Sequence, residues 1–132
     1  MFLTFNLSLS IYVERELANT AQVNTALEKA VDAQKAWKST TIAERAKICH
    51  KAVEYFMQNA DEIGEELTRQ MGRPIRYTAN EIKKGFKDRA EYMISVAEDA
   101  LADVQVEEIA GFKRFIRRDA LGVIFVVAPW NY

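Results

Sequence analysis

The chain has 132 residues, enough for one domain at most, and its 49% hydrophobic and 28% charged composition excludes a disordered protein. The 18 basic and 19 acidic residues leave a net charge of −1, which argues against a general nucleic-acid or membrane binder. A single cysteine excludes an internal disulfide framework and is compatible with a reducing compartment, and no stretch reaches the roughly 18 apolar residues of a membrane span.

The amino-terminal residues alternate between apolar and polar side chains from Leu3 to Val13. A period of two is typical of a half-buried strand. The alternative is a secretory signal peptide, but the segment lacks a basic beginning and a small-residue cleavage site. We therefore predict a strand here.

A run of amphipathic helices is predicted over residues 14–103. Each expected start carries the spacing of a capping box, in which two side chains three residues apart bond each other's backbone amides. The pairs are Asn19 and Gln22, Thr41 and Glu44, Asn59 and Glu62, and Thr78 and Glu81. Gly72 and Pro74 predict the end of the third helix.

The apolar stripes of these helices predict the core, and we expect Trp37, Phe56 and Phe86 to belong to it. Cys49 lies on such a stripe, so a buried thiol is favoured over a nucleophile. His50 follows it, but adjacent helical positions do not face each other, so we expect a surface histidine and no Cys–His pair. No metal site is expected.

After residue 103 the residue pattern changes from that of amphipathic helices to that of extended chain. Val104–Val106 predicts a short strand, and Gly111 predicts a turn. Phe112–Arg118 mixes apolar with basic residues, which suits an edge strand or a strand that pairs with another subunit. A phosphate-binding patch is the alternative, but the net charge near zero argues against nucleic acid.

Five large apolar residues, Val123–Val127, stand between Gly122 and Pro129 and predict a strand buried on both faces. Burying one such side chain contributes about 1.5–3 kcal/mol. Leaving the run half exposed would therefore forfeit much of a domain's net stability of about 5–15 kcal/mol. Because the chain offers few neighbouring strands, we do not expect it to fold autonomously.

Asn131 follows that predicted strand at its carboxyl end, where open α/β sheets place their ligands. A carboxamide donates hydrogen bonds without carrying charge, so it suits an oxyanion hole over a developing alkoxide. The alternative is that Asn131 caps a helix beginning beyond Tyr132, and spacing alone favours the cap.

Ala128-Pro129-Trp130-Asn131-Tyr132 closely resembles the Pro-Trp-Asn motif of the aldehyde dehydrogenase superfamily. Further matches occur upstream in the order that this family shows. They are Ala43-Glu44-Arg45, Met71-Gly72-Arg73-Pro74, Glu81, and Arg117-Arg118 before Leu121-Gly122. Residues 12–132 thus look like the amino-terminal helical region of the family, and the terminal motif is the specific part of the likeness.

The resemblance implies an α/β fold class: the amino-terminal part of a Rossmann-type domain, mostly helical here, with an edge strand and one buried terminal strand. It divides residues 1–132 into a helical region at 14–103, oligomerisation strands at 104–120, and the buried strand with its motif at 121–132. It implies an oxidoreductase that acts on an aldehyde with NAD or NADP, in the cytoplasm.

The resemblance also assigns roles to single positions. Asn131 would be the side-chain half of the oxyanion hole, and Val127, Ala128, Pro129 and Trp130 would line the nicotinamide-ribose side of the cofactor site. Phe112–Arg118 would lie in the arm that pairs subunits into a homo-oligomer.

The family's nucleophilic cysteine and general-base glutamate lie downstream of the Asn motif, and no residue here matches them. We therefore expect an amino-terminal fragment that is inactive alone. The alternative is a truncated helical interaction module that binds a full-length subunit through Phe112–Arg118, by adding a strand to its sheet edge.

Overall fold

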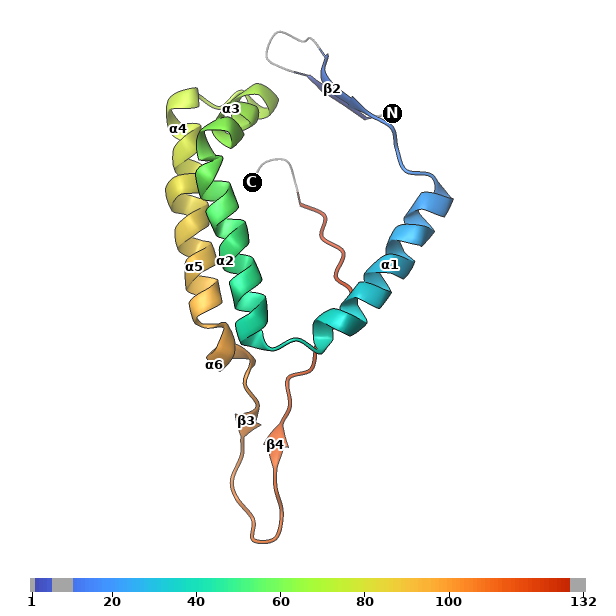
Figure 1. Ribbon diagram of the computed structural model, residues 1–132, viewed down its shortest axis with the longest axis vertical. Coiled ribbons are helices and arrows are strands. Elements are labelled where there is room, and N and C mark those ends of the chain that lie inside the picture. The colour runs from blue at the N-terminus through green and yellow to red at the C-terminus, as the bar shows by residue number, and fades with distance from the viewer. Residues whose placement is uncertain (1, 6–10, 129–132) are drawn as a thin grey trace.

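The computed structural model describes residues 2–5 and 11–128, and the predicted mostly helical architecture is confirmed (Figure 1). A strand pair comes first, then a series of helices, then a second strand pair. The strands are β1 (Phe2–Phe5), β2 (Ile11–Arg15), β3 (Val104–Gln105) and β4 (Phe115–Ile116). The helices are α1 (Thr20–Lys38), α2 (Ile42–Gln58), α3 (Ala60–Met71), α4 (Ile75–Asn80), the π-helix η1 (Glu81–Phe86), α5 (Lys87–Ser95) and α6 (Ala97–Leu101).

The amino-terminal segment forms two strands, where the alternation suggested one. β1 and β2 pair antiparallel, with Phe2 opposite Arg15 and Leu3 opposite Glu14. Residues 6–10 between them lie outside the described part of the chain. Two short strands satisfy each other's backbone hydrogen bonds, which a single strand without a neighbour cannot do.

The first two helices begin at the predicted capping boxes. The Asn19 side chain accepts the Gln22 backbone N–H at 3.0 Å, and the Gln22 side chain accepts the Asn19 N–H at 2.9 Å. Thr41 and Glu44 form the same reciprocal pair at 3.1 and 2.8 Å. Gly72 ends α3 in the left-handed conformation at φ 73°, as predicted.

The other two predicted capping boxes are wrong. Asn59 precedes α3, but its side-chain amide donates to the Tyr55 carbonyl of α2 at 2.7 Å and makes no cap. Thr78 lies inside α4 and not before a helix, because the helix already begins at Ile75 after Pro74. Glu81 therefore has no capping role, because Thr78 is itself helical, and Glu62 has none because Asn59 forms no side-chain cap.

The core lies where α2 packs against α3, η1 and α5. The buried apolar side chains among the described residues are Val53, Ala60 and Ile82, and Thr78 is buried with them. Phe56 and Phe86 pack with ring centroids 4.8 Å apart, although Phe56 stays partly exposed. Trp37 is exposed, which corrects its predicted place in the core: α1 buries no residue, so the described part of the chain leaves its apolar stripe largely uncovered.

The chain from residue 104 to 116 forms a hairpin that extends away from the helices (Figure 1). Val104 pairs with Ile116, and Gln105 pairs with Phe115. Gly111 makes the turn with φ 84°, as predicted, next to a bridge between Ile109 and Phe112. The predicted strand over Phe112–Arg118 is realised only at the two residues of β4.

The predicted buried strand at residues 123–127 is not formed. Residues 121–128 have no regular secondary structure, and Phe125 is 85% exposed. A strand of this kind requires neighbours on both edges and cover on both faces. The described residues offer neither, so the apolar run remains irregular and solvent-exposed.

Within residues 2–5 and 11–128, none of the helices is long and apolar enough to cross a bilayer.

Candidate functional site

The predicted site lies at the carboxyl end of the described chain. Val127 and Ala128 are both exposed, and Val127 shows 77% of its surface to solvent. Pro129, Trp130 and Asn131 lie outside the described residues. The structure therefore describes two of the five residues predicted for the site, Val127 and Ala128, together with the backbone that leads to them.

The segment that carries the motif is anchored at its base. Asp119 lies 3.5 Å from the Lys38 ammonium at the end of α1. Arg118 donates a hydrogen bond to the Ala100 carbonyl of α6, and Arg117 lies 3.8 Å from the Asp103 carboxylate. These contacts hold the chain to the helices just after β4. Residues 121–128 then extend from this anchored base.

The backbone conformation just before the apolar run requires a glycine. Gly122 has φ 102°, a conformation that side-chain-bearing residues rarely adopt. Nothing lies within 4 Å of the place where its Cβ would be, so the constraint comes from the backbone and not from crowding.

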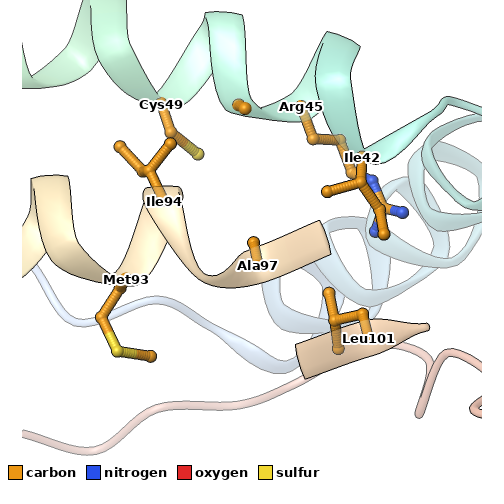
Figure 2. A pocket seen from close by; sticks show the side chains of 8 residues that line it. Ile42, Arg45, Cys49, Met93, Ile94, Ala97 and Leu101 are labelled. Atoms are coloured by element: carbon orange, nitrogen blue, oxygen red, sulfur yellow. The ribbon is translucent and has the colours of Figure 1, made fainter. Parts of the chain in front are cut away.

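A second feature is an apolar hollow of about 220 Å³ between α2 and the pair α5 and α6 (Figure 2). It is lined by Ile42, Arg45, Ala46, Cys49, Met93, Ile94, Ala97 and Leu101. Figure 2 shows the Cys49 side chain next to Ile94. Cys49 is exposed, which corrects the predicted buried thiol: α5 covers its stripe only partly.

The hollow does not offer a nucleophile–base pair. Among the residues that the structure describes, its lining contains no histidine or carboxylate, and His50 is exposed on the same helix as expected. A thiol acts as a nucleophile when a base or a positive environment favours the thiolate. Arg45 is the one charged residue of the lining. The prediction that Cys49 is not the nucleophile stays a prediction.

The resemblance to known proteins singled out Glu81, and the structure shows what it contacts. Arg73, in the turn between α3 and α4, donates to the Glu81 carboxylate at 2.8 Å, and both side chains are partly buried. This pair ties the turn to η1. Sequence reasoning missed it, because an eight-residue separation across a Gly-Arg-Pro turn follows no helical or strand period.

A second polar contact, also missed from the sequence, joins the amino-terminal strands to α3. The Tyr12 hydroxyl donates to the Glu66 carboxylate. This bond is the main reason why the pKa of Glu66 is lowered, and the Gln70 amide adds to it. The same bond raises the pKa of Tyr12. At neutral pH Glu66 is ionised and Tyr12 is protonated, and the hydrogen bond stabilises both of these states.

The hairpin presents both apolar and basic groups. Phe112 at its tip is 72% exposed. The Arg117 guanidinium lies 5.0 Å and the Lys113 ammonium 6.0 Å from the centre of the Phe115 ring. Arg114 donates to the Glu107 carbonyl at 3.4 Å. Two of the basic groups are thus engaged with an aromatic face, at distances typical of cation–π contacts.

Metal ligands do not gather in the part of the chain that the structure describes. No group of three or more His, Cys, Asp or Glu side chains lies close enough there to hold an ion.

The sequence model of the aldehyde dehydrogenase family matches residues 9–132. The match covers nearly the whole chain, from the start of β2 through the helices and the hairpin to the Pro-Trp-Asn motif.

Proposed function

Because the chain belongs to the aldehyde dehydrogenase family, whose members are oxidoreductases acting on aldehydes, we propose that it contributes the oxyanion-binding asparagine of such an enzyme. The observation that carries the proposal is the extent of the match. It includes the motif at residues 128–132 together with the helices that precede it.

Asn131 is the residue to which we assign a catalytic role. Its carboxamide would donate a hydrogen bond to the oxygen of the aldehyde carbonyl as that oxygen becomes an alkoxide. Preorganised donors of this kind stabilise the transition state more than the substrate, because charge develops only as the reaction proceeds. The support is the motif and the family match, since Asn131 lies outside the described residues.

NAD or NADP is the proposed acceptor, and it would take up hydride from the substrate when bound. Val127 and Ala128 fit one side of such a site, because they are apolar and exposed and suit contact with a flat ring. We assign Pro129 and Trp130 to the same surface. Val127 is 77% exposed in the described part of the chain, so this surface would form one wall of the site and not a complete dinucleotide cradle.

The hairpin is the proposed subunit contact, through Phe112–Arg118. Its support is geometric: the hairpin extends away from the helices, and Phe112 is exposed at its tip. A partner that covers Phe112 removes an aromatic ring from water. The same hairpin would serve the alternative function, in which the chain binds a full-length subunit by strand addition.

A polypeptide of these 132 residues is proposed to have no dehydrogenase activity by itself and to reside in the cytoplasm. Its only cysteine lies in the hollow between α2 and α5, on a different element from the motif. Incubation of the pure polypeptide with aldehyde and NAD should give no NADH above the rate without protein. Formation of one or more equivalents of NADH per polypeptide would contradict this proposal.

The function itself is tested by a chimera. Residues 9–132 would replace the matching segment of an active aldehyde dehydrogenase, which then contributes its own nucleophile and base. We expect the chimera to oxidise its aldehyde with a turnover within about tenfold of that of the parent. A tenfold lower rate corresponds to an activation free energy about 1.4 kcal/mol higher. A folded chimera that binds cofactor but shows no turnover would contradict the proposal.

A further inference from the structure

The Arg118 guanidinium fastens the chain to the end of helix α6. It donates a hydrogen bond to the backbone carbonyl of Ala100, in the last turn of that helix. Carbonyl groups in the last turn of a helix have no partner within the helix. Hydrogen bonds with a charged donor are also stronger than neutral ones. The contact therefore gives a free acceptor a strong partner and holds residue 118 against α6.

The residues on either side of Arg118 make two further contacts with the helical part of the chain. Arg117 lies 3.8 Å from the Asp103 carboxylate, and Asp119 lies 3.5 Å from the Lys38 ammonium at the end of α1. Three of these four side chains are more than half exposed, so each ion pair is weak by itself. Arg118 is therefore the main anchor, and the two ion pairs add to it.

The apolar run that follows carries little information about its own register in a sheet. Val123–Val127 has a large apolar side chain at every position, so a strand formed by it has two similar faces. A slip by one residue exchanges the two faces of a strand. Here the exchange leaves apolar side chains on both faces, so burial opposes the slip only weakly. Contacts outside the run are needed to set its register.

Asn131, in contrast, is sensitive to that register. A slip by one residue moves the chain by about 3.3 Å along the strand and exchanges its faces. A donor in an oxyanion hole must lie about 2.7–3.1 Å from the oxygen that it stabilises. A slip of the preceding run would therefore carry the carboxamide out of reach of the substrate oxygen.

We propose that Arg118 is a positioning residue for Asn131: its bond to Ala100 fixes the register of the run at residues 123–127 and thereby the place of the carboxamide. This inference rests on the proposed dehydrogenase function, in which the rest of the enzyme supplies the neighbours that the predicted strand lacks here. Arg118 acts through the chain that it anchors and not by contact with substrate or cofactor.

The test measures kcat at saturating NAD in the chimera that carries residues 9–132. Arg118→Ala removes the anchoring bond and should lower kcat about tenfold or more, since a small misplacement of a catalytic group can cost about 10²-fold. Arg118→Lys keeps a charged donor and should retain most of the kcat. Arg69→Ala is the matched control, because it removes an exposed arginine that pairs with Glu65 on α3. It should leave kcat unchanged.

The double variant separates positioning from a general structural role. If Arg118 acts through Asn131, adding Arg118→Ala to Asn131→Ala should lower kcat no further, because the positioned group is already absent. Unchanged kcat in Asn131→Ala alone would refute the proposed function itself. A loss of kcat in Asn131→Ala with none in Arg118→Ala would overturn only the positioning role.

Other outcomes would also contradict the positioning role. Losses that multiply in the double variant would show that Arg118 acts independently of Asn131, and equal losses in Arg118→Ala and Arg69→Ala would show an unspecific effect of charge. Sedimentation and circular dichroism check that each variant keeps its oligomeric state and fold, and a loss of kcat caused by dissociation would place Arg118 in the subunit contact instead. If the Arg118→Ala chimera is insoluble, Arg118→Gln takes its place in the same comparison.

Discussion

Thr78 is the side chain whose surroundings are most completely defined. It is fully buried, its hydroxyl donates to the Ile75 carbonyl at 3.0 Å, and the Thr68 hydroxyl lies 3.2 Å away. A threonine suits this position because burial without hydrogen bonds would be costly. Its hydroxyl joins α4 to α3 and thereby fixes the turn that contains Arg73.

We predict that Thr78→Val destabilises the protein by about 1 kcal/mol, because the shape is retained while the half-buried Thr68 hydroxyl loses a hydrogen-bond partner. Urea unfolding followed by circular dichroism measures the change. Thr25→Val on exposed α1 is the control and should change the free energy of unfolding by less than about 0.5 kcal/mol. Equal effects at the two positions would contradict this account.

The contact between Tyr12 and Glu66 predicts a pH dependence. Because the folded pKa of Glu66 is lowered, its stabilisation is present above the unfolded pKa of about 4.3 and is lost as the pH falls through the folded value. Because the pKa of Tyr12 is raised, its stabilisation is present below about pH 10 and is lost as the pH rises through its folded value. The contact should therefore persist between these limits.

Nuclear magnetic resonance of the Tyr12 ring should follow this transition at acid pH. Glu66→Gln should remove the acid transition, since glutamine still accepts a hydrogen bond but does not titrate there. Glu65→Gln, which affects the neighbouring pair with Arg69, should keep it. An acid transition that survives Glu66→Gln would show that another group is responsible.

Among the elements, α3 and α4 pack tightly at Gly64. A Cβ added at Gly64 would lie 2.9 Å from the Ala79 backbone nitrogen and 3.1 Å from its Cα. Backbone atoms cannot move aside as a flexible side chain can. Glycine at this position is therefore required by packing between helices and not by its own backbone conformation.

Gly64→Ala should destabilise the protein even though alanine favours helix by about 1 kcal/mol. The overlap with α4 costs about 1–3 kcal/mol, so the loss outweighs the gain. Gly85→Ala is the comparison, because its added Cβ would meet the side chain of Glu81 at 3.3 Å and no backbone. Chemical denaturation should show the larger loss for Gly64→Ala, and the reverse order would refute this explanation.

The starts of the helices show which structural features depend only on neighbouring residues in the sequence. Asn19 and Thr41 begin helices as their spacing predicted, because a capping box involves only four consecutive residues. Thr78 and Glu81 have the same spacing and form no cap, because Pro74 allows the helix to begin earlier and the packing of α3 buries Thr78. Spacing alone does not contain that tertiary information.

For the molecule as a whole, the main discrepancy concerns burial. The apolar stripe of α1 and the run at residues 123–127 were expected to be covered, yet both are exposed. Composition predicts that a segment favours burial, but burial also requires other elements to cover it. The same limit applies to the predicted site: Val127 and Ala128 are exposed, and their assignment to a cofactor site stays a prediction.

The central claim is that Asn131 stabilises an oxyanion in an aldehyde dehydrogenase, and kcat of the chimera with Asn131→Ala tests it most directly. We expect kcat to fall about 10²–10³-fold with the Kd for NAD unchanged, as for other lost oxyanion-hole donors. Tyr132→Phe, at the next residue, is the control and should leave kcat near that of the unsubstituted chimera. Unchanged kcat in Asn131→Ala would contradict the assignment.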